Sequence, residues 1–222
     1  MDYTVVRQDR KSVSIRVLDD GRVEVRAPLR CPEQDISRFV QAQSDWIARR
    51  RQELSQRRER AQRPPEFVRV QGESYPVSPS PDGRVRIDLR EKRAYLPQSA
   101  TAEQQRAAIA GCYRTLAQNV LPDRVQQIAQ RLGLTYGRVR INSAHGRWGS
   151  CSSQGNLNFS LYLMMASPKA VDAVVIHELL HRVQLNHSPE FRRLERQHTP
   201  DYEACRRELD ELALWMRREG WV

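Results

Sequence analysis

The chain has 222 residues, of which 39% are hydrophobic and 29% charged, and its formal net charge at pH 7 is +10. This length allows one large domain or two small ones with a buried core, and the composition excludes a disordered chain. The positive charge favours acidic partners such as nucleic acid, nucleotides, anionic lipid or acidic peptides. Lysine occurs only at Lys11, Lys92 and Lys169, so the charge is mostly arginine, a bias that a GC-rich genome produces as readily as phosphate binding does.

The cysteines and apolar runs bear on the cellular compartment. No Cys-x-x-Cys pair is present, so neither a disulfide framework nor a cysteine zinc site is indicated, and a reducing cytoplasm fits best. Residues 1–7 lack the apolar core of a signal peptide, and no later run approaches the roughly 20 apolar residues that a membrane span needs. We therefore expect a cytoplasmic protein with no membrane partner. The four cysteines are Cys31, Cys112, Cys151 and Cys205.

The N-terminal part predicts strands followed by one long basic helix. Alternating apolar residues on either side of an Asp19-Asp20-Gly21 turn predict strands over residues 3–28. A helix is predicted from Pro32 to residue 63, before Pro64-Pro65, because apolar residues recur at helical spacing. Its far end, residues 49–63, holds seven arginines and two glutamates and is the best candidate for a face that binds nucleotides or nucleic acid. The competing interpretation is an ordinary solvated helix surface. The apolar positions are Ile36, Val40, Ile47 and Leu54.

A second β segment follows over residues 67–96, with a hairpin turn at Asp82-Gly83. The composition changes near Pro97, which places a domain boundary there. The predicted fold is α+β: a β-rich N-terminal subdomain over residues 1–97, which includes the basic helix, and a second domain over residues 98–222.

The second domain is predicted to open with a long helix. Thr101 and Gln104 have the spacing of a capping box, Pro122 restarts or kinks the helix, and Gly133 ends it. Residues 139–163 then predict strands around a tight loop.

The most informative stretch is His177-Glu178-Leu179-Leu180-His181, within an apolar helical run that begins after Ser167-Pro168. Residues four apart share a helix face, so the two imidazoles lie side by side. This spacing suits two ligands of a tetrahedral zinc ion, with Glu178 beside them to handle a proton. The competing interpretation is a helix that carries two histidines and a glutamate by chance, but three of the five histidines fall within eleven residues.

His187 is the favoured third ligand, but only if the chain turns. In a continuous helix its side chain would lie about 240° around the axis from His181. The helix is therefore predicted to end between Val183 and Asn186, with Asn186 as a left-handed cap and Ser188-Pro189 opening the next helix. The rival third ligands are Glu195, Glu203 and Glu208.

Three protein ligands leave one position of the metal for water, as in catalytic zinc sites. Zinc lowers the pKa of that water toward about 7, and Glu178 would accept its proton and deliver it to the leaving group. Arg147 and Tyr202 are the candidate donors to the developing oxyanion, against a structural ion pair for Arg147 and ordinary packing for Tyr202. Cys151 is not expected to be a nucleophile, since no base lies near it in the sequence.

Several motifs together resemble the YgjP-like metal-dependent hydrolases, small bacterial zincins related to the WLM and SprT-like groups. They are Arg147-Trp148-Gly149-Ser150-Cys151, the strand from Leu157 to Leu161, the stretch from Val175 to His181, and Asn186-His187-Ser188-Pro189-Glu190-Phe191. The likeness extends more weakly to the N-terminal strands, the helix after Pro32 and Pro200-Asp201-Tyr202, so it covers most of the chain.

The resemblance implies a zincin fold with a mixed sheet packed on the site helix, zinc bound by His177, His181 and His187, and Glu178 as the acid/base. It also implies an edge strand that faces the cleft, for which residues 157–161 are the candidate, and a peptide could pair with it in extended form. Two positions depart from the family, since Leu180 often corresponds to cysteine and Arg192 to an aromatic residue. These departures bear on substrate fit rather than on metal binding.

Three functions follow from these patterns. The first is a zinc metallopeptidase acting on peptides or proteins. The second is a metal-dependent hydrolase of nucleotide phosphoanhydrides, in which arginines hold the phosphates. The third is a nucleic-acid-binding protein without catalysis, and the intact Glu178 argues against it because a structural metal site needs no base.

Overall fold

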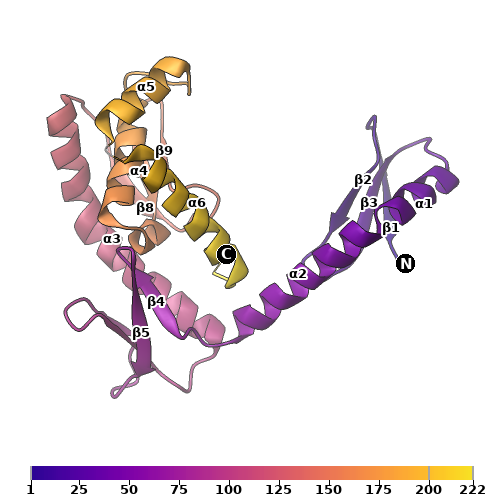
Figure 1. Cartoon of the computed structure of the whole chain (residues 1–222), viewed down its shortest axis with the longest axis horizontal. Coiled ribbons are helices and arrows are strands. Elements are labelled where there is room, and N and C mark those ends of the chain that lie inside the picture. The colour runs from indigo at the N-terminus through magenta and orange to yellow at the C-terminus, as the bar shows by residue number, and fades with distance from the viewer. Residues whose placement is uncertain (1, 200, 222) are drawn as a thin grey trace. The chain divides into compact units, whose positions relative to one another are not determined.

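The computed structural model describes residues 2–199 and 201–221, which form an α+β structure (Figure 1). It divides into two compact units, residues 1–61 and residues 62–222, each with its own hydrophobic core. Pro200, part of the family likeness, lies outside the described residues. Among those residues, no helix is long and apolar enough to span a bilayer.

The first unit is a three-stranded sheet with helices packed on one face. β1 (Thr4–Gln8) pairs in parallel with β3 (Val23–Pro28), and β2 (Ser14–Val17) pairs antiparallel with the other side of β3. The buried side chains of β3 alternate with partly exposed ones, and they meet the apolar faces of the two helices. Strands over residues 3–28 were predicted correctly, because the alternation and the turn are local signals.

The basic helix predicted over residues 32–63 is two helices. α1 (Glu33–Ala42) is capped by Gln43, whose φ of −104° and ψ of 11° leave the helical region, and α2 (Ser44–Gln62) follows at once. Both helices bury apolar residues in the same core. The helix therefore stops at Gln62 as the two prolines require, but it contains an interruption that the apolar spacing did not reveal.

The second unit begins with a four-stranded sheet in the order β4-β5-β7-β6. The turn between its first two strands uses Gln71 and Gly72, both with positive φ. The strands are β4 (Phe67–Val70), β5 (Glu73–Pro79), β6 (Arg86–Asp88) and β7 (Arg93–Leu96). Their buried residues belong to the same core as the histidine-bearing helix. The boundary expected near Pro97 therefore does not coincide with the division into units, because the change from strands to helices there does not separate two cores.

The long helix α3 (Ala102–Leu132) lies across this core. Its N-terminus has the predicted capping box of Thr101 and Gln104, and Gly133 caps its end with a φ of 66°. Pro122 lies inside the helix rather than at a break between two helices. The helix is tied to the first sheet of the unit by Tyr113, whose hydroxyl donates a 2.6 Å hydrogen bond to the carbonyl of Arg69.

A second, mixed sheet lies next to the histidine-bearing helix. It has the order β8-β10-β9, from β8 (Val139–Asn142), β9 (Gly149–Cys151) and β10 (Leu157–Ser160). β10 pairs in parallel with β8 and antiparallel with β9, so it is the central strand. The expectation that residues 157–161 form the edge strand is therefore wrong. The parallel pairing with β8 joins segments that no hairpin connects, so the local pattern could not predict it.

Three helices complete the unit: α4 (Pro168–Leu180), α5 (Pro189–His198) and α6 (Tyr202–Arg218). The short 3-10 helix η1 (Leu161–Met165) leads from β10 into α4. α4 contacts α3, α5, α6 and β9, and most of its residues are buried. The helix with the histidines is thus the centre of the second unit.

Candidate metal centre

The local sequence fixes where α4 begins. The hydroxyl of Ser167 accepts a 3.3 Å hydrogen bond from the amide of Ala170, and Pro168 occupies the first helical turn, both as predicted. The carboxylate of Glu208, on α6, accepts 2.6 Å hydrogen bonds from both the amide and the hydroxyl of Ser167. The start of the helix is thus anchored to a second helix.

His177, His181 and His187 converge at the other end of α4. One ligand nitrogen from each lies within 4.8 Å of those of the other two. The Nε2 atoms of His177 and His187 are 3.2 Å apart. Two nitrogens bound to one tetrahedral zinc at about 2.05 Å lie roughly 3.3 Å apart, so this spacing fits a shared metal ion.

The turn that brings His187 to the other two histidines begins earlier than predicted. α4 ends at Leu180, and the amides of Arg182, Val183 and Gln184 form the turn that follows. Asn186 does not have the left-handed conformation expected of it. Ser188 caps α5 as predicted, through a 3.3 Å hydrogen bond to its hydroxyl from the amide of Phe191.

Phe191 forms the floor of the histidine cluster. Its ring is fully buried, and its centroid lies 5.1 Å, 4.7 Å and 5.0 Å from those of His177, His181 and His187. One apolar ring thus packs against all three imidazoles and restricts their orientations.

Two of the imidazoles also have partners at Nδ1. His177 Nδ1 lies 2.6 Å from a carboxylate oxygen of Glu195, and His181 Nδ1 lies 3.1 Å from the carbonyl oxygen of Gln184. Both partners are hydrogen-bond acceptors, so Nδ1 is the donor in each contact and Nε2 is the nitrogen left to face a metal. Burial lowers the pKa of His181 and of His187, which favours the neutral form that a metal needs. The donor set therefore fits a divalent ion such as zinc.

Glu195 is a partner of a histidine rather than a third ligand. It is only 3% exposed, and Arg192 (2.9 Å) and the hydroxyl of Tyr202 (3.3 Å) both donate to its second oxygen. Burial raises the pKa of Glu195, but the hydrogen bonds from His177 and Arg192 outweigh burial and leave it lowered, so the carboxylate stays charged. Carboxylates in this position fix the tautomer and orientation of metal-binding histidines. The sequence pattern offered Glu195 only as a rival ligand.

The other two rival glutamates lie elsewhere. Glu203 accepts a 3.1 Å hydrogen bond from Arg196 at the surface, and Glu208 caps α4. Of the remaining histidines, His145 packs beside the ring of Tyr162, and His198 does not belong to the cluster.

Glu178 is 5% exposed and faces the strand β9. Burial raises its pKa to about 7, although the charges of His177 and Arg147 act in the opposite direction. A side chain at Gly149 would place its Cβ 2.6 Å from a carboxylate oxygen of Glu178. The glycine is therefore required by the close approach of the glutamate, which its position in the sequence did not indicate.

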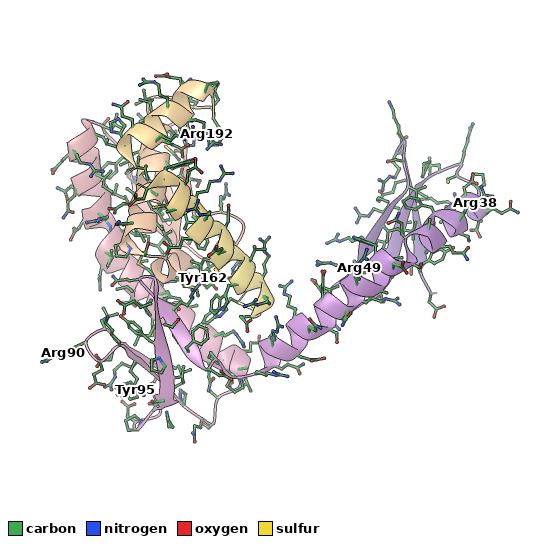
Figure 2. The ribbon with its side chains drawn as sticks, in the orientation of Figure 1. Arg38, Arg49, Arg90, Tyr95, Tyr162 and Arg192 are labelled. Carbon is green, nitrogen blue, oxygen red and sulfur yellow. The ribbon has the colours of Figure 1, made fainter. Side chains whose placement is uncertain are left out.

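A pocket of about 370 Å³ opens beside Glu178. Arg147 and Tyr202, the two candidate oxyanion donors, both line it. The Tyr202 hydroxyl donates to Glu195 and accepts a 3.1 Å hydrogen bond from Arg192, which Figure 2 labels on α5. Burial raises the pKa of the Cys151 thiol, and the charge of Glu178 adds to this effect.

The sequence matches a known protein family over most of its length. Residues 11–212 match the family described as YgjP-like, metallopeptidase domain. The chain belongs to the YgjP-like family. The resemblance expected from the motifs is thus confirmed, and the family places this YgjP-like chain among the metal-dependent peptidases.

Comparison with curated proteins gave no match to this YgjP-like chain. Among solved structures, the chain is similar to the metallopeptidase zymogen jannalysin from Methanocaldococcus jannaschii, with 20% sequence identity. The similarity covers 45% of this chain and 95% of jannalysin, with a TM-score of 0.34. A TM-score this low does not establish a common fold.

Proposed function

We propose that the second unit is a zincin-like peptidase domain that binds one zinc ion through His177, His181 and His187. The main support is the convergence of three imidazole nitrogens beside a pocket whose wall contains the buried Glu178. Zinc held there supplies a Lewis acid that polarises a peptide carbonyl and lowers the pKa of water. The pocket has a volume of about 370 Å³ and is lined by both Glu178 and His177, which leaves room for part of a substrate beside the base.

Glu178 is proposed to act as the general base and then as the general acid. Its carboxylate would accept a proton from the attacking water and return it to the leaving amine. A pKa raised to about 7 by burial lies in the range where one group can do both near neutral pH. Arg147 is the preferred donor to the developing oxyanion, because Tyr202 would have to release Glu195 to act in that way.

The edge strand β9 is proposed to bind the substrate backbone. Trp148 accepts a hydrogen bond from the amide of Ser160, and Ser152 donates one to the carbonyl of Asn156, so these residues face the neighbouring segment. In an antiparallel pair, the backbone N–H and C=O groups of successive residues point alternately toward the partner strand and away from it. The backbone groups of Gly149 and Cys151 therefore face the free edge of the sheet. Gly149 also touches Glu178, so a peptide paired with this edge would run past the base.

The proposal is tested by metal analysis combined with hydrolysis of casein and of unstructured peptides. Wild-type protein and Glu178→Gln should both contain about one zinc per chain, because the glutamate is not a proposed ligand. The variant should lose hydrolysis by about 100- to 10,000-fold, the usual contribution of a general acid–base group. Glu203→Gln is the matched control, since that glutamate pairs with Arg196 at the surface, and it should retain activity.

A protein that binds no zinc, or a Glu178→Gln variant that cleaves peptides like wild type, would refute the proposal. Substitution of each histidine by alanine should lower the zinc content, and an unchanged content in all three variants would refute the ligand set.

Hydrolysis of nucleotide phosphoanhydrides is the second candidate, and one observation favours it. Arg147, Arg192 and Arg206 all line the pocket and could hold phosphates. Two of them already face carboxylates, since Arg192 donates to Glu195 and Arg206 lies 4.0 Å from Asp210. The same assay should therefore include nucleoside triphosphates. Cleavage of triphosphates that depends on Glu178, with no peptide cleavage, would establish this candidate in place of the first.

A further inference from the structure

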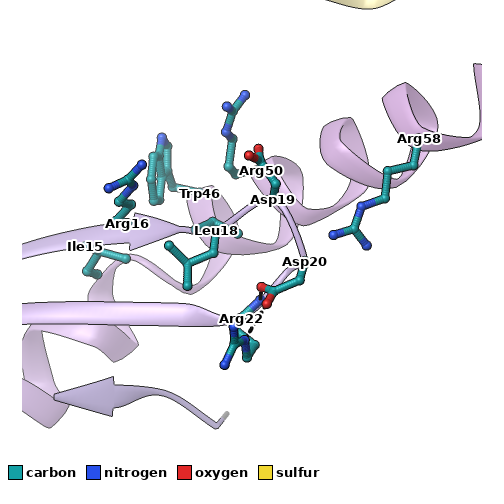
Figure 3. Close-up of a pocket in the computed structure, with 10 residues that line it drawn as sticks. Ile15, Arg16, Leu18, Asp19, Asp20, Arg22, Trp46, Arg50 and Arg58 are labelled. Carbon is teal, nitrogen blue, oxygen red and sulfur yellow. Dashed lines mark hydrogen bonds and ion pairs between the residues drawn. The ribbon is translucent and has the colours of Figure 1, made fainter. Parts of the chain in front are cut away.

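The first unit has a hollow of its own, of about 690 Å³, that the peptidase proposal does not use. It lies between β2 with the turn that follows it and one side of α2 (Figure 3). The lining residues that matter below are Arg16, Arg22, Trp46, Arg50 and Arg58.

The hollow is positively charged. Its wall contains four arginines and two aspartates, Asp19 and Asp20. Arg22 is hydrogen-bonded to Asp20, and Arg50 forms a 2.9 Å ion pair with Glu53, which is 64% exposed. An ion pair this open to water is weak, so Arg50 can exchange it for another anion at little cost. The positive charges of the four arginines thus exceed the negative charges of the two aspartates in the wall of the hollow.

Trp46 gives the hollow an open aromatic surface. Trp46 is 41% exposed, although the next residue, Ile47, is completely buried in the core of the unit. Arg50 lies four residues further along α2, on the same helix face. In Figure 3 the indole of Trp46 and the guanidinium groups of Arg16 and Arg50 point to the same side of the ribbon. A flat ring beside cations is the arrangement that binds a nucleobase together with its phosphates.

The hollow extends beyond one nucleotide. From Trp46 to Arg58 the helix axis advances by about 18 Å at 1.5 Å per residue, and Arg58 lies about 120° around the axis, so a strand that contacts both residues would curve around α2 (Figure 3). Stacked nucleotides rise about 3.4 Å each, so this length accommodates several of them.

An extended peptide is the competing occupant, because β2 is an edge strand. The amide of Leu18 donates a hydrogen bond to the carbonyl of Arg22, across from it on the chain that leads into β3. Successive residues of an antiparallel strand point their backbone groups to opposite sides, so those of Ile15 and Val17 face the free edge of β2. Strand addition uses backbone groups and side-chain pockets. It accounts neither for four guanidinium groups nor for an exposed indole, and single-stranded nucleic acid accounts for both.

We propose that this hollow binds single-stranded nucleic acid, with a base stacked on Trp46 and phosphates contacting Arg16, Arg50 and Arg58. The site lies wholly in the first unit and needs no metal. The outcome of a test of nucleic-acid binding is therefore independent of whether the peptidase proposal holds.

The test measures fluorescence anisotropy of labelled oligo(dT) and oligo(U) of roughly 12 nucleotides, bound to the full-length protein across a salt series. Three phosphate contacts predict a slope of log affinity against log salt of about −2. Arg16→Gln, Arg50→Gln and Arg58→Gln should each reduce the magnitude of that slope by about 0.7. Arg38→Gln is the matched control, because this arginine is 80% exposed on α1, outside the hollow (Figure 2).

Stacking is tested at Trp46 itself. Trp46→Ala should weaken binding by about 5- to 150-fold, the range for loss of one stacked base. Trp46→Phe keeps an aromatic ring and should retain most of the affinity. It should also abolish the quenching of tryptophan fluorescence that the oligonucleotide causes in the wild-type protein. Thermal unfolding followed by circular dichroism confirms that each variant is folded.

Several outcomes would overturn the proposal. Equal losses in Arg38→Gln and Arg50→Gln would mean attraction to the general positive charge rather than to the hollow. Equal affinity of Trp46→Ala and wild type, or equal affinity for a duplex of the same sequence, would refute stacking. No oligonucleotide binding, with binding of an acidic peptide that Arg50→Gln weakens, would make the hollow a peptide site. Preference between oligo(dT) and oligo(U) identifies the nucleic acid.

Discussion

The buried carboxylate of Glu178 makes the stability of the metal-free protein depend on pH. Burial raises the pKa of this group from 4.5 in the unfolded chain to about 7 in the folded one. Folding therefore favours the protonated form, and stability is lost as the pH rises from about 4.5 to about 7. Glu178→Gln removes this loss. After chelation of metal, the variant should be more stable than wild type at pH 8, by at most about 3 kcal/mol, and similar at pH 4.5.

Urea unfolding at the two pH values measures this difference. Glu211→Gln, at an exposed position on α6, should show no such change and serves as the control. A variant and wild type with the same dependence on pH would show that Glu178 is hydrated in the folded protein.

Gly149 provides a second test at the level of single residues. Gly149→Ala brings a methyl group to 2.6 Å from the Glu178 carboxylate, so either the strand or the carboxylate must move. We expect a loss of about 1–3 kcal/mol in stability, the usual cost of overpacking, and a large fall in activity. Gly146→Ala is the matched control, because its added carbon would contact nothing within 4 Å. Equal behaviour of the two variants would contradict the close approach.

Glu195 should act on metal affinity rather than on the chemical step. Glu195→Gln keeps the shape of the side chain but removes the charge that orients His177. Changes at such partners of metal ligands typically lower metal affinity by 10- to 100-fold. Competition with a chromogenic chelator measures the zinc affinity, and Glu203→Gln should match wild type. A Glu195→Gln variant with unchanged zinc affinity but low activity would place the glutamate in catalysis instead.

At the level of elements, the start of α4 depends on α6. Glu208→Ala leaves the partly buried amide of Ser167 without its acceptor, which costs at most about 1–3 kcal/mol, the penalty for a fully buried donor. We therefore expect a lower midpoint of urea unfolding for this variant. Glu211→Ala, three residues further along the same helix and exposed, should have little effect. Similar midpoints for the two variants would mean that water replaces the lost carboxylate.

The elements also show which features the sequence could predict. The capping box at Thr101, the cap at Ser167 and the two histidines one turn apart follow from contacts within a few residues, and all of them are present. The interruption at Gln43 was missed, and so was the central place of β10. These depend on packing between segments distant in the sequence, which periodicity does not encode. The contact between Gly149 and Glu178 is also of this long-range kind.

At the level of the whole molecule, the two separate cores predict two unfolding transitions. The candidate zinc ligands lie entirely in the second unit. A ligand stabilises the unit that binds it by about 4 kcal/mol at a thousand times its dissociation constant. Zinc should therefore raise the melting temperature of only one of the two transitions in scanning calorimetry. A single transition that shifts as a whole would show that the units unfold together.

The division into units also shows why the change in composition near Pro97 does not separate two cores. The sequence changes character near Pro97, but Ala94 and Leu96 on β7 pack in the same core as Val175 on α4. Composition reports the kind of secondary structure, and core membership depends on which faces meet in three dimensions. The arginines near residue 60 gave no sign of the division, because they lie within the continuous helix α2.

The free edge of β9 has a consequence for the choice of substrates. It is three residues long and offers few backbone hydrogen bonds, so in the proposed pairing it would accept only a segment whose own backbone groups are unpaired. Strands inside folded proteins have already satisfied those groups with their neighbours. A peptidase that binds the substrate backbone along this edge would not cleave native proteins and would act on unfolded chains. Discrimination against folded proteins would then come from the geometry of one short strand rather than from a separate inhibitor.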